Sequence, residues 1–511
     1  MALSTGLSTF AEHKGTIASV VVASLVIYQA WRIVYNVFFH PLAKFPGPWW
    51  ASLSLLHEFY FDVMQDGQYF KVIERMHEKY GPIVRVNPSE LHINDPTFYD
   101  EVFPGPGRRR DKAPENRGIS SVPTSMVSTL DHDHHRERRA ILQNFFSKQA
   151  ITKLEDIIQD KVDHCVERLK DACKEGQVLE LYHVFAALTS DVISHYSYGE
   201  SFGYLGDENF RGEIVEDAVG LLKRVHVGRL FPWLAGTLAP LPSWLLKALS
   251  PPLGNILDMQ AHLIGLSAKA LRSTDSTSKG QTTIFDALTS PEVPKYERHT
   301  TRVADEALLV TLAGTETTSR TLTAVVYRVM QDPRILEKVR AELRSVMPTP
   351  DAKPSWRQLE QLPYLTAVLH EALRMAHLLI RSPRIAPDEV LVYRDWVIPP
   401  GTSLSMITDL MSMNPTIYPE PQLFRPERWT EAATRGERLK LFAFSAGSRN
   451  CLGLNLAWAE LYLTTAAIFR WFDFEALNAD PATFEPYRDW GFGVREDGYF
   501  GLKVNVRRVL T

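Results

Sequence analysis

The feature that most constrains this chain is a ten-residue stretch near its C-terminal end, residues 444–453, with the sequence FSAGSRNCLG. Cys451 lies between two glycines there, and an apolar run typical of a helix follows over residues 454–469. Unpaired N–H groups and the dipole at the start of a helix favour a thiolate. The glycines let backbone approach a large flat group, and Arg449 can hold an anion. Together these features predict a cysteine thiolate bound to the iron of a porphyrin.

This stretch resembles the haem-binding signature of the cytochrome P450 family, the haem-thiolate monooxygenases, at every fixed position. The resemblance implies a mainly α-helical fold with small β-sheets, an N-terminal transmembrane helix, and haem b (iron protoporphyrin IX) with Cys451 as the axial ligand. A buried structural cysteine in a glycine-rich turn is the alternative for such a stretch taken alone. The other cofactor-binding residues implied within the signature are Phe444, Gly447, Arg449 and Gly453.

The composition is that of an ordinary globular protein, with 511 residues of which 45% are hydrophobic and 23% charged. Length alone would suggest about three domains, whereas the resemblance implies one catalytic domain over residues 51–511. The net charge of −4 gives no general attraction to nucleic acid. Three cysteines provide no disulfide framework, and Cys165 and Cys173 are expected to be buried thiols in a helix.

An uncharged apolar run over residues 15–31 continues, after Arg32, through Phe39. This is just long enough to span a bilayer. A cleaved signal peptide is the competing interpretation, but the polar segment before the run is long and nearly uncharged, while basic residues follow the run. Such flanking charges favour a cytosolic C-terminal side. We therefore predict a single-pass anchor in the endoplasmic reticulum membrane over residues 1–40, with the catalytic domain facing the cytosol.

Several segments outside the motifs have clear local patterns. Two prolines around a glycine predict a stiff hinge over residues 41–50. Residues 105–127 lack a period and are expected to form a loop, which in the family covers the substrate. Residues 227–246 are apolar but interrupted by glycine and proline, so they cannot span a membrane; they could dip into its surface or pack as a lid. Strand pairs are expected over residues 83–93 and 390–398, and a last small sheet over residues 491–504.

A long helix is predicted over residues 304–330, and it contains an unfavourable sequence in its middle. Glycine there costs about 1 kcal/mol relative to alanine, and threonine can bend the helix. The sequence AGTETT at 313–318 resembles the family's oxygen-activation motif. The resemblance implies that Gly314 opens a groove for dioxygen, that the Thr317 hydroxyl bonds to the reacting oxygen, and that Glu316 passes protons inward. A polar surface face is the alternative, but apolar residues surround the motif.

The run of charged residues and histidines over 131–139 invites a zinc interpretation, since His132 and His135 lie one turn apart. Five interleaved charges and the lack of a further ligand cluster argue against zinc. The family often has Trp-x-x-x-Arg here, whose two donors hold a haem propionate. The resemblance places Arg139 at the arginine and His135 at the tryptophan, and residues four apart share a helix face.

A helix over residues 364–375 carries Glu371 and Arg374, whose apolar surroundings indicate partial burial. A buried pair needs a further partner, and Arg428 in the later Pro-Glu-Arg sequence is available. The family has this same structural triad behind its haem loop.

Arg384 follows Arg374 by ten residues and matches a family arginine that binds a haem propionate. Arg381 is a weaker candidate for the same role. His377 occupies a position where the family usually has proline. This departure bears on the backbone conformation expected here and on the substrate-facing residues 378–382.

The four signatures together resemble a monooxygenase that inserts one oxygen atom from O2 into a lipophilic secondary-metabolite intermediate (terpenoid, polyketide or alkaloid). Residues 40–42, 135–136 and 359–364 further resemble fungal members that oxidise sesquiterpenes such as trichodiene. No glycine-rich dinucleotide or flavin motif occurs, so electrons from NADPH would arrive through NADPH–cytochrome P450 reductase, with cytochrome b5 as an optional second donor. A haem-thiolate isomerase or peroxide-driven enzyme, and a non-catalytic haem protein that binds a ligand, are the alternatives.

Overall fold

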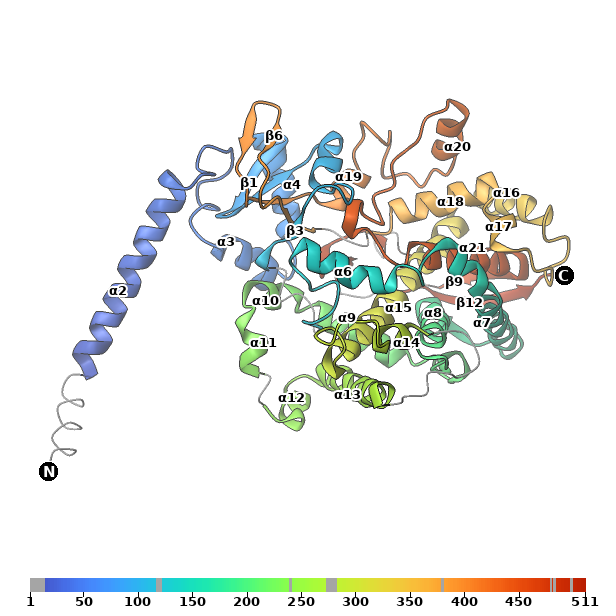
Figure 1. The fold of residues 1–511 in the computed structure, drawn as a ribbon. Helices are drawn as coiled ribbons and strands as arrows, with labels where there is room; N and C mark the ends of the chain where they lie inside the picture. Colours follow the sequence, from blue (N-terminus) through green and yellow to red (C-terminus); the bar gives the residue numbers. More distant parts are fainter. Residues whose placement is uncertain are drawn as a thin grey trace.

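The computed structural model of the chain describes residues 14–115, 122–238, 241–272, 283–377, 381–477, 480, 484–496 and 500–511. A helical body carries small sheets at its edges, and one long helix, α2 (Lys14–Val34), projects away from it (Figure 1). Residues 273–281, whose Ser/Thr/Gly-rich sequence predicts a surface loop, lie outside the described residues. The predicted mainly helical fold with small sheets and one N-terminal apolar helix is confirmed.

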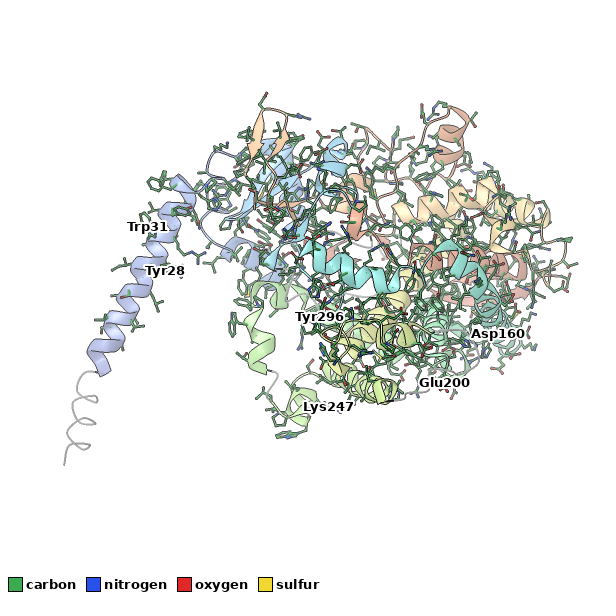
Figure 2. All side chains as sticks on the ribbon, viewed as in Figure 1. Tyr28, Trp31, Asp160, Glu200, Lys247 and Tyr296 are labelled. Carbon is green, nitrogen blue, oxygen red and sulfur yellow. The ribbon has the colours of Figure 1, made fainter. Side chains whose placement is uncertain are left out.

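Helix α2 continues into a π-helical turn, η1 (Tyr35–Phe39), and makes almost no contact with the body. Its apolar side chains are exposed, as those of Tyr28 and Trp31 illustrate (Figure 2). Ala18–Phe39 is the one helical stretch of the described chain that is long and apolar enough to cross a membrane. At 1.5 Å per residue its 22 residues span about 33 Å, close to the hydrocarbon thickness of a bilayer.

The centre of the body is α15 (Thr300–Gln331), which is surrounded by α8 (Leu181–Tyr198), α13 (Pro251–Arg272), α18 (Pro363–Arg374) and α21 (Leu454–Trp471). Most side chains of α15 are buried around its whole circumference, as expected for a helix packed on all sides. Its predicted range is confirmed and extended by a turn at the start. The expected helices over 364–375 and 454–469 are confirmed as well.

The largest sheet has the strand order β1-β2-β8-β5-β3. The predicted hairpin is confirmed, with Ile83 opposite Ile93, and both its strands are buried on both faces. The prediction of a loop over residues 105–127 is wrong at β3. This short strand lies within that range and pairs with β5. The strands are β1 (Ile83–Asn87), β2 (Glu90–Ile93), β3 (Asp111–Lys112), β5 (Arg384–Ile385) and β8 (Ser403–Ser405).

Three smaller sheets complete the β-structure. The predicted pair over 390–398 is confirmed as β6 and β7. The single last sheet expected over 491–504 is wrong, because this segment is divided between the β10-β11 pair and the β4-β12-β9 sheet. Their bounds are β4 (Val178–Glu180), β6 (Leu391–Tyr393), β7 (Trp396–Ile398), β9 (Phe472–Ala476), β10 (Arg488–Asp489), β11 (Gly493–Val494) and β12 (Lys503–Val509).

The described residues of the segment over 227–246 form short helices, α10, α11 and the start of α12, in line with the prediction that this segment contains no membrane-spanning helix. Of the two non-signature cysteines on α7 (Lys148–Glu175), Cys165 is buried as expected, but Cys173 is only half-buried. The remaining helices and helical turns are α3 (Leu56–Phe59), η2 (Tyr60–Met64), α4 (Tyr69–Tyr80), η3 (Pro96–Phe98), α5 (Tyr99–Val102), α6 (His132–Leu142), η5 (Tyr204–Gly206), α9 (Gly212–Leu222), α10 (Val225–Leu230), α11 (Trp233–Leu238), α12 (Ser243–Leu249), α14 (Ile284–Thr289), α16 (Pro333–Arg344), α17 (Trp356–Leu359), α19 (Thr408–Ser412), α20 (Glu427–Thr434) and η6 (Gly447–Arg449).

Candidate active site

A cavity of about 520 Å³ lies between α15, α6, the β5 segment and the loop before α21. It collects residues from all of the predicted motifs except the buried triad. Gly447 and Glu316 do not line it. The predicted site residues that do are His135, Arg139, Thr317, Arg384, Phe444, Arg449, Cys451 and Gly453.

Cys451 lines this cavity and is accessible from it, while the protein atoms around the residue desolvate its thiol. The cysteine backbone is fixed by a hydrogen bond from its N–H to the Phe444 carbonyl at 2.9 Å. Burial raises the pKa of the thiol, whereas the Gly453 N–H, which donates to the sulfur, and the nearby Arg139 lower it. A coordinated metal ion deprotonates a cysteine outright, so the burial that holds the free thiol neutral would not prevent iron ligation.

Arg229 and Arg381 line the cavity and pair with Glu58. Five other basic residues of the lining form no ion pair with a carboxylate of any described residue, namely Lys112, His135, Arg139, Arg384 and Arg449. Burial lowers the pKa of His135 to about 2, of Arg449 to about 9 and of Arg384 to about 10, and repulsion from neighbouring cations adds to the shifts of His135 and Arg449. Burial also lowers the pKa of Arg139 and that of Lys112. Unpaired buried cations are costly. This donor set therefore fits a flat cofactor that brings carboxylates, as a porphyrin with two propionates does.

Two of the guanidinium groups also brace the cysteine loop. Arg139 donates to both the carbonyl and the side-chain oxygen of Asn450, each at 2.7 Å. Arg449 donates to the carbonyls of Thr129 and Leu130 at 2.8 and 2.7 Å. The loop that carries the cysteine is thereby tied to α6 and to the segment before it. The expectation that His135 and Arg139 share one helix face is met, since both line the cavity.

Lys112 is a cavity residue that sequence reasoning missed. It lies on β3, directly opposite Arg384 on β5. Its ammonium group donates to the Val127 carbonyl and is surrounded by cations. The run of basic residues around Lys112 gave no indication of this position, because only the pairing of two short strands distant in sequence brings Lys112 to the cavity.

The two glycines of the signature have different neighbours. A Cβ built on Gly447 would lie 2.2 Å from the Pro104 carbonyl oxygen, and φ there is +73°. Gly447 thus permits contact with protein backbone, not the contact with a flat group that we expected. A Cβ on Gly453 would meet no atom within 4 Å. Since Gly453 lines the cavity, only a cavity occupant would require it to be glycine, which again fits a porphyrin.

On α15, Thr317 faces the cavity and donates to the Ala313 carbonyl one turn earlier at 2.9 Å. Such a bond back to the helix weakens the normal ladder and favours a bend. Gly314 also lines the cavity, yet its missing side chain has a second consequence. A Cβ there would lie 2.8 Å from the Ile193 side chain of α8. This glycine therefore also allows the close packing of α8 on α15.

Glu316 is buried and points away from the cavity. Its carboxylate accepts a hydrogen bond from the Tyr182 hydroxyl and lies 3.5 Å from the Arg320 guanidinium. Burial raises the pKa of Glu316, and the charge of Arg320 opposes this shift. Sequence reasoning missed both partners. Tyr182 comes from α8 and no local pattern marks it, whereas the spacing of four residues between Glu316 and Arg320 on one helix could have indicated their pairing.

The predicted triad is assembled and fully buried. Arg374 donates to both oxygens of Glu371, at 2.8 and 3.0 Å, and Arg428 donates to one of them at 3.0 Å. The indole N–H of Trp429 is a further donor, at 2.8 Å, that the sequence motif did not indicate. These groups lie outside the cavity and hold α18 to the α20 segment.

Arg381, the weaker propionate candidate, also lines the cavity, but its charge is compensated by protein carboxylates. Its guanidinium pairs with Glu58 and lies 3.8 Å from Glu90. His377 adopts a left-handed backbone with φ +49°, which proline cannot reach because its ring fixes φ near −65°. This conformation accounts for the departure from the family pattern, although the following residues 378–380 lie outside the described part of the chain.

The histidine-rich run forms no metal site. His134 pairs with Glu297, and His132 accepts a hydrogen bond from the Arg110 N–H at 3.3 Å. Within the ranges that the structure describes, no three His, Cys, Asp or Glu side chains gather as metal ligands.

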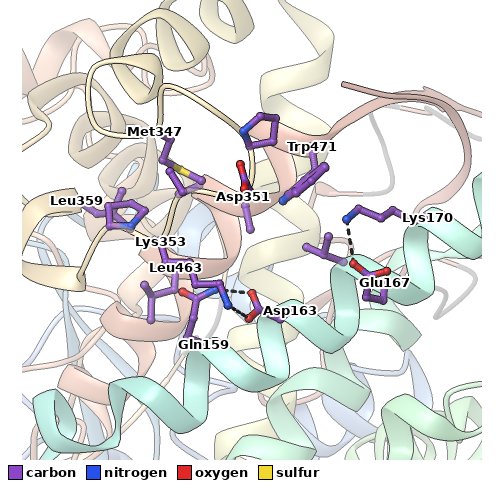
Figure 3. Close-up of a pocket in the computed structure, with 16 residues that line it drawn as sticks. Gln159, Asp163, Glu167, Lys170, Met347, Asp351, Lys353, Leu359, Leu463 and Trp471 are labelled. Carbon is purple, nitrogen blue, oxygen red and sulfur yellow. Dashed lines mark hydrogen bonds and ion pairs between the residues drawn. The ribbon is translucent and has the colours of Figure 1, made fainter. Parts of the chain in front are cut away.

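A second hollow of about 250 Å³ lies on the surface between α7, α21 and the loop over residues 347–354 (Figure 3). Its charged side chains pair with each other, for example Lys170 with Glu167 at 2.9 Å and Lys353 with Asp163. It contains none of the predicted site residues. The chemistry therefore belongs to the cavity beside Cys451.

Comparison with known proteins agrees with this geometry. The model of the cytochrome P450 family matches residues 44–500. The chain is 42% identical to conidiogenone synthase PchP450 of Penicillium rubens over 94% of its own length and 97% of that relative. It is 40% identical to cytochrome P450 monooxygenase aflU of Aspergillus parasiticus (94% and 97%) and 40% identical to cytochrome P450 monooxygenase TRI4 of Fusarium sporotrichioides (91% and 90%). The chain thus belongs to the cytochrome P450 family and is an oxidoreductase that incorporates oxygen from O2.

Proposed function

We propose that this monooxygenase oxidises a lipophilic intermediate of fungal secondary metabolism, such as a terpenoid, polyketide or alkaloid. The single observation that carries the proposal is that Cys451 and Thr317 line one cavity of about 520 Å³. Its α15 wall is apolar at Leu309, Val310 and Ala313, which suits a hydrocarbon skeleton. The similarity to secondary-metabolism enzymes such as conidiogenone synthase supports the same substrate class.

The cofactor in this proposal is haem b, with Cys451 as its axial ligand. His135, Arg139 and Arg384 would hold the propionates, and Lys112 and Arg449 add positive charge beside them. Phe444 and Gly453 would lie against the ring. When bound, the haem supplies O2 binding and O–O cleavage, to which a thiolate ligand contributes electron density.

The protein's own contribution is to position the substrate and to supply protons. The Thr317 hydroxyl, now bonded to Ala313, can turn to donate into the cavity. Glu316 holds a proton readily because burial raises its pKa. The Tyr182 hydroxyl donates a hydrogen bond to the Glu316 carboxylate. General acid assistance of this kind contributes about 10²–10⁴-fold. In the net reaction, the substrate, O2, two electrons and two protons give an oxygenated product and water.

Electrons would come from NADPH–cytochrome P450 reductase, with cytochrome b5 as an optional second donor. We assign residues 1–40 to a single-pass anchor in the endoplasmic reticulum membrane, 41–50 to the hinge and 51–511 to the cytosolic catalytic domain. The exposed apolar surface of α2 supports the anchor. Exposed aromatic side chains on the body, such as Trp49 and Trp233, suit the interface of a membrane.

The test compares Thr317→Ala with Thr323→Ala in the reductase-supported, full-length enzyme. Thr323 is a matched control because it makes the same bond back to its helix, at 2.8 Å to Ser319, but does not line the cavity. Product formed per O2 consumed should fall about tenfold or more in Thr317→Ala, with peroxide released instead, and should not change in Thr323→Ala.

Unchanged coupling in Thr317→Ala would contradict the role proposed for this hydroxyl. A wild type that forms no oxygenated product, and whose ligand binding is unaffected by Thr317→Ala, would favour a non-catalytic haem protein. Product formation without O2 would favour the isomerase or peroxide-driven alternative.

A further inference from the structure

One face of α15 forms the wall of the cavity and carries a carboxylate at its far end. Glu306, Leu309, Val310, Ala313 and Thr317 follow the helical spacing i, i+3, i+4, i+7 and i+11, which places them on one face, and all line the cavity. Glu306 precedes Thr317 by eleven residues, which corresponds to about 16 Å along a helix. An apolar stretch therefore separates the proposed oxygen-activating hydroxyl from an acidic group.

Glu306 is the last member of a buried chain of alternating charges. Arg138 donates to Glu297 at 2.9 Å, and Glu297 accepts from Arg302 at 2.8 Å. Arg302 in turn donates to Glu306 Oε2 at 2.5 Å. All four side chains are at least nine-tenths buried. The chain fixes the Glu306 carboxylate rigidly at the cavity wall.

Only one oxygen of Glu306 has partners. Oε2 accepts from Arg302 and from the Met126 N–H at 2.8 Å, whereas Oε1 has no hydrogen bond although the side chain is 0% exposed. Glu115, on the loop that also lines the cavity, has an unpaired buried oxygen as well. Buried polar atoms are nearly always paired, and an unpaired one is unfavourable. Since no described residue donates to Oε1, the occupant of the cavity is the available source.

We propose that Glu306 determines substrate specificity by accepting a hydrogen bond from an O–H or N–H group at the end of the substrate remote from the reacting carbon. This inference rests on the proposed function, because it takes the cavity as the substrate site. It narrows the substrate class to apolar skeletons that already carry a hydroxyl or an ammonium group. The enzyme then acts after a step that installs such a group.

The experiment measures heats of binding to the full-length, haem-loaded protein with three probes of equal chain length: 1-dodecanol, 1-methoxydodecane and dodecylammonium. In the wild type, the alcohol or the ammonium should bind about tenfold or more tightly than the ether, as expected for a hydrogen bond to a charged acceptor. The tighter of the two donors identifies whether the natural group is a hydroxyl or a cation. Equal affinity for the alcohol, the ammonium and the ether would overturn the proposal with the wild type alone.

The matched variants are Glu306→Gln and Asp305→Asn. Glutamine can still accept from Arg302 while it presents an N–H in place of the free oxygen, so the preference should vanish or reverse toward the ether. Asp305 is equally buried and binds the same loop, through the Thr124 N–H at 2.8 Å, but does not line the cavity. Asp305→Asn should keep the wild-type preference. Comparing ratios between variants cancels differences in how the probes partition into detergent.

A preference that survives in Glu306→Gln would contradict the inference, and so would its equal loss in Asp305→Asn, which would indicate a purely structural role. Binding heats do not depend on turnover. A protein that binds donors preferentially but forms no oxygenated product would refute the proposed function and leave the recognition by Glu306 intact.

Discussion

Two buried glutamates of this protein, Glu371 in the triad and Glu306 at the cavity, are both held by arginine but differ in how completely they are paired. Both oxygens of Glu371 accept, from two arginine side chains, an indole and a backbone N–H. Glu306 has donors on one oxygen only. A fully paired buried network holds elements together, whereas an incompletely paired one at a cavity leaves a place for a ligand.

The largest effect is expected at the complete network. Glu371→Gln leaves Arg374 and Arg428 buried without a carboxylate, which should lower the free energy of unfolding by about 3–5 kcal/mol. Denaturant unfolding monitored by circular dichroism measures this loss. The exposed pair of Glu431 with Arg425 serves as control, since Glu431→Gln should cost no more than about 1 kcal/mol. Similar losses in both variants would contradict the architectural role of the triad.

The two glycines of the cysteine signature, Gly447 and Gly453, provide a second comparison between a residue that contacts protein and a residue that contacts the occupant of the cavity. Gly447→Ala should lower the free energy of unfolding by roughly 2 kcal/mol or more, because φ is +73° and a Cβ would approach the Pro104 carbonyl. Gly453→Ala meets no protein atom. It should leave the stability of the haem-free chain unchanged and reduce haem retention. Unfolding curves and the haem-to-protein ratio distinguish the two, and equal loss of stability in both would be the opposing result.

The two glutamates also illustrate which parts of the structure could be predicted from the sequence and which could not. α15, the Glu371–Arg374 pair and the cysteine loop were predictable because each is a contiguous motif, and helical spacing fixes which side chains of a helix share a face. Arg428 could be assigned to the triad only through the resemblance to the family. Lys112, Tyr182 and Trp429 were missed because they reach their partners only through long-range pairing of separate elements. Glu306 gave no local signal, since its meaning depends on an oxygen that no protein group reaches.

A smaller, pH-dependent effect is expected at a fully paired neutral network. His77 bonds to the Gly81 carbonyl at 2.8 Å and to His92 at 2.6 Å. Burial lowers the pKa of His77 to about 4, below its usual value of 6.5. The unfolded chain therefore binds the proton more tightly, so the free energy of unfolding should decrease between pH 6.5 and about 4. The expected slope is on the order of 1 kcal/mol per pH unit.

Unfolding curves across this pH range measure that slope. It should shrink in His77→Gln and persist in His164→Gln, where the histidine is exposed. A slope unaffected by His77→Gln would assign the pH dependence to other groups.

The central claim is that the Cys451 sulfur is the axial ligand of a haem in this cavity, and the most direct test is the absorbance of the reduced protein with carbon monoxide. The wild type should show the strongly red-shifted Soret band of thiolate ligation. Cys451→Ser should lack this band while it keeps its circular dichroism spectrum. A folded, haem-loaded wild-type protein without the red-shifted band, or a Cys451→Ser variant that retains it, would contradict the account.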